Sequence, residues 1–147
     1  MATAFKAETP VTPLVTSADQ LPDLYAMVGK GRCMEPEVMD GTCLAFDKHE
    51  EPVSGDTVIL WFRPEFAKED GTQCMYKRLV ALPPVSLPFK LAPTSNCVPV
   101  VTVEMLNPPR RFNFPVTELL AVHKCIGPAE PKGNGVAALR RKKEVLA

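Results

Sequence analysis

Proline residues restrict how this chain can fold more than any other feature of its sequence. Among the 147 residues there are 16 prolines, which is about twice the usual share. Proline fixes one backbone angle and removes a hydrogen-bond donor, so it interrupts helices and is tolerated in turns and at sheet edges. A chain of this length can form one domain with a real core. We therefore expect a single mainly β domain of short, bent antiparallel strands and hairpins, with no helix longer than about three turns.

Apolar segments between the turn signals predict the strands themselves. The sequence TVILWF at residues 57–62 is β-branched and aromatic, and it is the most strand-like run in the chain. The charged stretch 63–73 leads to a second apolar stretch at residues 74–82, so these two strands are expected to form a long hairpin. Residues 89–92 and 98–106 are predicted as further strands. The latter alternates apolar and polar side chains, as a half-buried antiparallel strand does.

A turn-rich loop is predicted at residues 31–41, which read GRCMEPEVMDG. Its proline and its Asp-Gly pair favour a loop over a helix. Short apolar runs at residues 24–28 and 42–46 flank it and are predicted as strands. Because two strands support such a loop, Cys33 near its tip is a good position for a nucleophile or a binding residue.

The spacing Gly-x-Cys-Met-x-Pro, followed by Asp-Gly, resembles the nucleophile loop of LexA/UmuD-like self-cleaving repressors and their signal-peptidase relatives. Those proteins use a Ser–Lys dyad, so the resemblance implies that Cys33 stands where the family has serine. MYKRLV at residues 75–80 resembles the family's lysine strand, with Lys77 as the dyad lysine. The resemblance extends over residues 24–127 and includes SGDTVIL at 54–60, LNPPRRFNFP at 106–115 and LLAVHKCIG at 119–127.

The resemblance implies a domain organisation and a set of site residues. Residues 21–127 would form a LexA-type peptidase-like domain, preceded by an extended arm at 1–20 and followed by a flexible basic tail at 128–147. Hydrolysis of a peptide or protein substrate would occur in trans or on a partner, since no Ala-Gly or Cys-Gly bond precedes Cys33 for self-cleavage. The implied residues are Cys33 and Lys77 for catalysis, Arg32 and Met34 for support of the oxyanion loop, and Met27, Val28 and Gly29 for substrate binding.

The chemistry of such a pair depends on its surroundings. Burial removes water from a lysine ammonium and favours the neutral amine, which can then act as a base. The apolar neighbours Met75 and Leu79 share a strand face with Lys77 and favour such burial. With cysteine as the nucleophile, the proton can pass fully to the amine and leave a thiolate and an ammonium.

Composition excludes several other classes of protein. The 17 basic and 17 acidic residues cancel, so no overall charge favours nucleic acid or a membrane surface. No apolar run approaches the roughly 20 residues of a membrane span, and the proline-rich arm is too short for a helix-turn-helix. We expect no membrane association, no direct nucleic-acid binding, and a cytoplasmic location with reduced thiols, because the five cysteines are odd in number and form no Cys-x-x-Cys pair.

No cofactor and no metal are expected. His123 and Cys125 lie on one face of a predicted strand, but no second pair has the spacing of zinc ligands, and buried strand residues are the favoured interpretation.

Two alternatives to peptidase activity remain open at this point. One is a catalytically silent interaction module, because domains of the related family form homodimers through their later strands, here residues 98–126. The other is a thiol-based redox sensor, because a thiolate beside a lysine at Cys33 is readily oxidised. A homodimer is expected.

Overall fold

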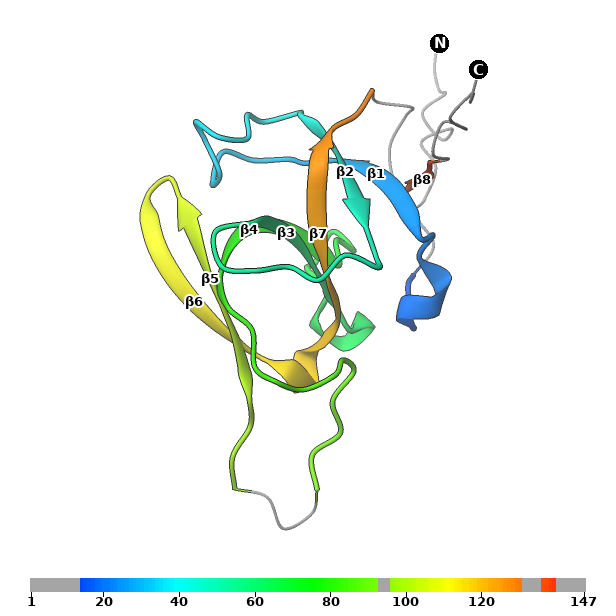
Figure 1. Cartoon of the computed structure of the whole chain (residues 1–147), viewed down its shortest axis with the longest axis vertical. Coiled ribbons are helices and arrows are strands. Elements are labelled where there is room, and N and C mark those ends of the chain that lie inside the picture. Colours follow the sequence, from blue (N-terminus) through cyan, green and yellow to red (C-terminus); the bar gives the residue numbers. More distant parts are fainter. Residues whose placement is uncertain (1–13, 93–95, 131–135, 140–147) are drawn as a thin grey trace, which may run out of the picture.

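The computed structural model describes residues 14–92, 96–130 and 136–139, which form one eight-stranded antiparallel sheet (Figure 1). Its strand order is β6-β5-β4-β3-β7-β2-β1-β8. The strands are β1 (Leu24–Val28), β2 (Cys43–Asp47), β3 (Thr57–Phe62), β4 (Cys74–Ala81), β5 (Val100–Leu106), β6 (Pro109–Pro115), β7 (Leu119–Pro128) and β8 (Ala137–Ala138). The prediction of a mainly β fold is confirmed.

The sheet is strongly curved. Register irregularities interrupt three of its pairings, next to Phe46 in β2, next to Phe62 in β3 and next to Leu79 in β4. Such bulges bend a strand and increase its twist. As a result β1 lies close to β4, although β3, β7 and β2 separate the two in the sheet order. This curvature is what brings the candidate site together.

Both faces of β3 are buried, and each faces a different core. Ile59 and Trp61 face a core that also contains aromatic hydroxyl groups, which we call the mixed core. Val58 and Leu60 face a core of apolar residues alone, which we call the apolar core. The mixed core consists of Val15, Leu21, Tyr25, Met34, Val38, Leu44, Phe46, Ile59, Trp61, Tyr76, Leu120 and Ala121; the apolar core consists of Val58, Leu60, Phe62, Leu79, Val101, Val103, Val116 and Leu119.

Helical structure in the described ranges is limited to three short 3-10 turns. These are η2 (Ala18–Gln20), η3 (Pro64–Phe66) and η4 (Val116–Glu118). Ser17 caps η2, since its side chain accepts a hydrogen bond from the Asp19 amide at 3.2 Å. Within the described part of the chain, no helix has the length and apolar character needed to cross a membrane.

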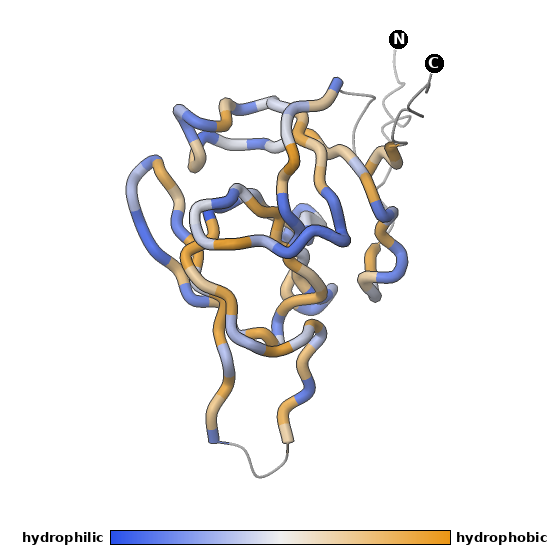
Figure 2. The backbone as a smooth tube through the Cα atoms, in the orientation of Figure 1, coloured by the Kyte–Doolittle hydropathy of each residue, from blue (hydrophilic) through white to orange (hydrophobic). Residues whose placement is uncertain are grey.

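The predicted strand at residues 89–92 is wrong, because the structure has an irregular segment there. Of its apolar side chains, Phe89 packs against the apolar core, as the preceding Leu87 does, whereas Leu91 is exposed. Conversely, β6 (Pro109–Pro115) is a strand that the proline-rich sequence did not indicate. It lies at one end of the sheet order, where a missing backbone donor is tolerated (Figure 2 shows hydrophilic residues near its turn).

The ends of the described chain are attached to the sheet. Val15 exchanges hydrogen bonds with the Gln73 side chain, which accepts from the Val15 amide at 2.8 Å and donates to its carbonyl at 2.7 Å. In the segment for which a tail is expected, β8 pairs with β1 and the Leu139 amide donates to the Leu24 carbonyl at 2.8 Å. Residues 1–13, 131–135 and 140–147 lie outside the described ranges, and with them the basic cluster of the tail.

Candidate functional site

The loop between β1 and β2 carries Cys33 and is closed at its base. The Gly29 amide donates to the Thr42 carbonyl at 3.0 Å, and the Gly29 carbonyl accepts from the Gly41 amide at 2.9 Å. Higher in the loop, the Gly31 amide donates to Oδ1 of Asp40 at 2.8 Å. The turn residues that predicted a loop therefore also provide the hydrogen bonds that close it.

Two contacts tie the loop to strands that lie far away in sequence. The carbonyl oxygen of Cys33 accepts hydrogen bonds from the amides of Leu106 (2.7 Å) and Asn107 (3.0 Å), at the turn of the β5–β6 hairpin. Glu37 forms a close ion pair with Arg78 of β4. Both contacts restrict the loop near Cys33, so its backbone direction is determined by tertiary structure.

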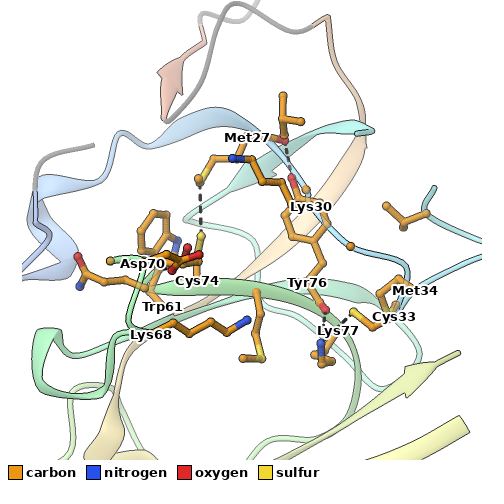
Figure 3. Close-up of a pocket in the computed structure, with 18 of the residues that line it drawn as sticks. Met27, Lys30, Cys33, Met34, Trp61, Lys68, Asp70, Cys74, Tyr76 and Lys77 are labelled. Carbon is orange, nitrogen blue, oxygen red and sulfur yellow. Dashed lines mark hydrogen bonds between the residues drawn. The ribbon is translucent and has the colours of Figure 1, made fainter. Parts of the chain in front are cut away.

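Cys33 and Lys77 are in direct contact. Nζ of Lys77 donates to Sγ of Cys33 at 3.2 Å and to the carbonyl oxygen of Tyr76 at 3.1 Å (Figure 3). Lys77 is only 6% exposed, whereas Cys33 is half-buried and reachable from solvent. A buried lysine amine in contact with a partly accessible sulfur is an arrangement in which proton transfer can produce a reactive thiolate.

A cavity of about 630 Å³ opens onto this pair. The predicted binding residues Met27, Val28 and Gly29 line it, as do Cys33 and Lys77. Much of the remaining wall is apolar or sulfur-containing, while Lys30, Lys68 and Asp70 add charge. These further lining residues include Met34, Met39, Trp61, Cys74, Met75 and Tyr76. The size matches that of a pocket for a small ligand or a short peptide segment.

The two predicted loop-support residues have different positions. Met34 is buried at 2% exposure and lines the cavity, and its carbonyl accepts from the Val38 amide at 2.9 Å. The side chain of Arg32 is 80% exposed and faces Glu35 at 3.9 Å. Arg32 therefore contributes to the loop through its backbone carbonyl, which accepts from the Glu35 amide at 3.1 Å.

Two strand edges face the cavity. β4 pairs with β3 from Cys74 onward but with β5 only from Arg78 onward. On the other side, β8 pairs with β1 at Tyr25 and Ala26 and does not extend to Met27. In the described part of the chain, the start of β4 and the end of β1 thus have one edge each without a strand partner.

A second thiol in the cavity differs from Cys33. Sγ of Cys74 lies 3.9 Å from Sδ of Met27, and burial raises the pKa of Cys74 to about 12. Burial also raises the pKa of Cys43 and of Cys125. These thiols therefore stay protonated at neutral pH.

His123 belongs to a buried hydrogen-bond chain beneath the cavity. Nε1 of Trp61 donates to the Tyr25 hydroxyl at 2.8 Å, and this hydroxyl lies 2.6 Å from Nδ1 of His123. Burial, with a smaller contribution from Lys48, lowers the pKa of His123 to about 4. His123 is therefore neutral at pH 7, and its Nδ1 accepts a hydrogen bond from the Tyr25 hydroxyl, whose own hydrogen-bond acceptance from Trp61 leaves its proton to donate. Among the described residues, no three His, Cys, Asp or Glu side chains gather in a way that could hold a metal ion.

Sequence reasoning did not identify several residues of the site. Tyr76 was passed over because it points to the opposite strand face from its neighbour Lys77. The backbone donors of Leu106 and Asn107 carry no side-chain signal at all. Trp61 and Cys74 were treated only as strand residues, although both line the cavity.

Known proteins provide no assignment for this chain. No protein-family model matches it, no curated protein matches it, and no solved structure matches it. The chemistry of the site therefore rests on its own residues and their geometry.

Proposed function

We propose that this chain is a LexA-like peptidase domain that hydrolyses peptide bonds in trans, with Cys33 as nucleophile and Lys77 as its proton-transfer partner. One observation carries the proposal: Nζ of a lysine that is 6% exposed lies 3.2 Å from Sγ of a cysteine that opens onto a cavity. Nucleophile and base within hydrogen-bond reach are the minimum that covalent catalysis requires.

The proposed reaction has two stages, acylation of Cys33 and hydrolysis of the resulting thioester. The Cys33 thiolate attacks the scissile carbonyl carbon, and the resulting oxyanion is stabilised by loop amides at Cys33 and Met34. Collapse breaks the C–N bond, and the Lys77 ammonium gives a proton to the leaving amine. A water molecule then attacks the thioester carbonyl carbon and gives a proton to the neutral Lys77. The C–S bond breaks, which releases the acid product and restores the Cys33 thiolate. No cofactor takes part.

The substrate is a peptide or protein segment in an extended conformation. The unpaired edges at the start of β4 and the end of β1 offer backbone groups to such a segment, and the apolar cavity wall offers contacts for alternate side chains. Arg32 helps to shape the loop through its backbone, while Met27, Val28 and Gly29 line the path of the substrate.

A cytoplasmic setting is part of the proposal. Cys33, Cys43, Cys74 and Cys125 are free thiols, and a reducing compartment keeps them so. Oxidation of Cys33 would abolish catalysis, so sensing of oxidants is retained as a minor alternative that uses the same thiol.

A second candidate function is a homodimeric interaction module without catalysis. It is favoured by the position of β6 at one end of the sheet order and by exposed apolar residues in the later strands, Val100 in the neighbouring β5 and Ile126 in β7. An exposed strand edge is a template for pairing with a second copy. Sedimentation over a concentration series tests it, with Val100→Lys expected to weaken association. A monomer at all concentrations would remove this candidate.

The decisive experiment measures the rate of iodoacetamide labelling at Cys33 against pH, resolved by mass spectrometry. Lys77→Met keeps an apolar side chain and removes the cation, so labelling at neutral pH should fall by roughly tenfold. Lys68→Met is the matched control, because it removes another cation from the same cavity without contact to Sγ. Cys74 serves as an internal reference that should react slowly in every variant.

Identical Cys33 profiles in the parent and in Lys77→Met would contradict the paired thiolate and leave the interaction module. Catalysis itself is then tested with a mixture of unstructured peptides and product mass spectrometry. Cleavage that is present in the parent and lost in both Cys33→Ala and Lys77→Met supports the peptidase. A parent protein with a reactive Cys33 but no cleavage of any peptide would favour the thiol sensor.

A further inference from the structure

Tyr76 connects the two halves of the site. Its side chain is buried, and its hydroxyl donates a short hydrogen bond to the Met27 carbonyl at the end of β1. Its own carbonyl oxygen, on β4, accepts from Nζ of Lys77 at 3.1 Å. One residue thus contacts both the lysine and the strand that leads into the Cys33 loop (Figure 3).

The ring of Tyr76 also lies against the base of that loop. A Cβ atom built on Gly29 would be only 2.4 Å from Cε2 of Tyr76 and 2.7 Å from its Cδ2. Gly29 is the residue whose amide and carbonyl close the loop by bonding Thr42 and Gly41. Glycine is therefore required here by close packing against an aromatic ring, not by an unusual backbone angle.

The ring is held rigidly enough to act as a spacer. Its centroid is 5.3 Å from that of Phe46, with the planes tilted by 54°. Burial raises the pKa of the Tyr76 hydroxyl above its usual value, so the phenol remains protonated and can donate to Met27. Packing and hydrogen bonding together leave little freedom for this side chain.

The distance between β1 and β4 needs such a spacer. Three strands separate them in the sheet order, so ladder hydrogen bonds do not join them directly. Small changes of twist in those three strands would add up at the far end, where Cys33 and Lys77 must stay in contact. The hairpin turn at Leu106 and Asn107 binds the Cys33 carbonyl, and Arg78 binds Glu37, but both contacts lie beyond the base of the loop at Gly29.

We propose that Tyr76 is a positioning residue, which spaces the base of the nucleophile loop from β4 and so keeps Sγ of Cys33 within reach of Nζ of Lys77. This inference rests on the proposed function, because the contact matters for catalysis only if the pair reacts. Because the Tyr76 hydroxyl already donates to the Met27 carbonyl, this proposal has no amide of a bound peptide donating to that carbonyl.

The test combines two measurements on the 147-residue chain. In Tyr76→Phe, which keeps the ring and removes the hydroxyl, the Cys33 labelling profile should move toward that of Lys77→Met. We expect a loss of roughly tenfold in labelling at neutral pH, since a displacement of about 1 Å can cost a reacting pair still more. Hydrogen exchange in peptides covering residues 29–41 should become faster. Gly29→Ala, which displaces the ring, should also slow Cys33 labelling and speed hydrogen exchange in the loop.

Tyr25→Phe is the matched control. It also removes a buried hydroxyl from the mixed core, so it lowers stability, but Tyr25 contacts neither Met27 nor Lys77 through a hydrogen bond and should leave the Cys33 profile unchanged. If Tyr76 had a purely structural role, Tyr76→Phe would leave the Cys33 labelling profile unchanged, as Tyr25→Phe is expected to do.

The possible results are distinguishable. Unchanged loop exchange in Tyr76→Phe overturns the spacer. A shifted profile in Lys77→Met with a parental profile in Tyr76→Phe also overturns it and leaves the proposed function intact. Faster loop exchange with identical labelling profiles in the parent, Lys77→Met and Tyr76→Phe supports the spacer as a structural contact, overturns its role in positioning a reactive pair, and contradicts the proposed function.

Discussion

The mixed core and the apolar core lie on opposite faces of β3 and are built differently. The apolar core contains aliphatic side chains and phenylalanine, so its contacts have no preferred direction. The mixed core contains Tyr25, Trp61 and Tyr76, each with a polar group that bonds to a specific partner. The cavity opens on the side of the mixed core, with Trp61 and Tyr76 in its wall.

This difference suggests separate roles for the two cores: one contributes mainly to stability, and the other fixes the geometry of the site. Non-directional burial stabilises the curved sheet but tolerates small displacements. Buried hydrogen bonds contribute less net free energy, yet they tolerate little displacement because an unsatisfied buried group is costly. We therefore expect variants of the apolar core to change stability most, and variants of the mixed core to change geometry more than stability.

The largest effect is expected in the apolar core. Leu60 is fully buried, and Leu60→Ala should lower the free energy of unfolding by about 3 kcal/mol, through lost burial and a residual cavity. Labelling of Cys33 in the folded protein should remain parental. Urea unfolding measures the first quantity, and Leu91→Ala, at a site 39% exposed, is the control that should cost far less. A large change in Cys33 labelling would show that the two cores are not separable.

A smaller loss is expected for Tyr25→Phe in the mixed core. The variant keeps the ring but leaves Nε1 of Trp61 and Nδ1 of His123 without their partner, at a cost of about 2 kcal/mol. Urea unfolding of the parent and the variant gives the difference. A loss in the double variant Tyr25→Phe/His123→Ala that is smaller than the sum of the two single losses would show that the two residues act as one network. No measurable loss would mean that water replaces the missing hydroxyl.

His123 makes stability depend on pH in a defined window. Its folded pKa of about 4 lies below the unfolded value near 6.5, so between these values the unfolded chain binds a proton that the folded chain does not. Stability should therefore fall as pH decreases from about 6.5 to 4, by at most about 1.4 kcal/mol per pH unit from this group. Above pH 6.5, His123 is neutral in both states and does not contribute to the pH dependence of stability.

The variant His123→Gln keeps a hydrogen-bond acceptor for Tyr25 and cannot titrate in this window. The difference between its stability curve and that of the parent isolates the histidine, because the carboxylates are common to both. His49→Gln is the control, since the His49 side chain is 69% exposed. Parallel curves for the parent and His123→Gln would contradict a buried, neutral histidine.

The smallest effect is expected outside both cores. The Asp23–His49 ion pair has a separation of 2.9 Å, but its side chains are 75% and 69% exposed. Asp23→Asn should change stability by less than about 0.5 kcal/mol at pH 6, because solvent screens such a pair. Urea unfolding at low and high salt measures it. A loss comparable to that of Tyr25→Phe would show that surface charge matters as much as the mixed core.

Much of the fold was accessible from local sequence. The run at Thr57–Phe62 forms β3 as predicted, and the apolar run at Leu24–Val28 forms β1, because β-branched and aromatic side chains fit a pleated surface. The failures concern segments whose role depends on neighbours. Phe89 packs against the apolar core from a segment without strand pairing, and Pro109–Pro115 pairs at a sheet end despite its prolines.

The candidate site shows the same division. Cys33 was singled out by the turn residues around it, and Lys77 by its position in an apolar strand, both through a family resemblance. The sequence pattern could not predict the 3.2 Å distance between Nζ of Lys77 and Sγ of Cys33. It also could not predict the contacts of Tyr76 or the amide donors of Leu106 and Asn107. Backbone donors have no sequence signature, and a spacer is recognised only when both of its contacts are known.

The sequence by itself determined the mainly β character, the short strands and the turn-rich loop, because proline, glycine and β-branched residues act on the backbone within a few positions. Only the tertiary structure decided that Cys33 and Lys77 meet across 44 positions of chain. That contact depends on the curvature accumulated over β4, β3, β7, β2 and β1, and curvature is set by bulges and by packing between strands, which no local pattern encodes.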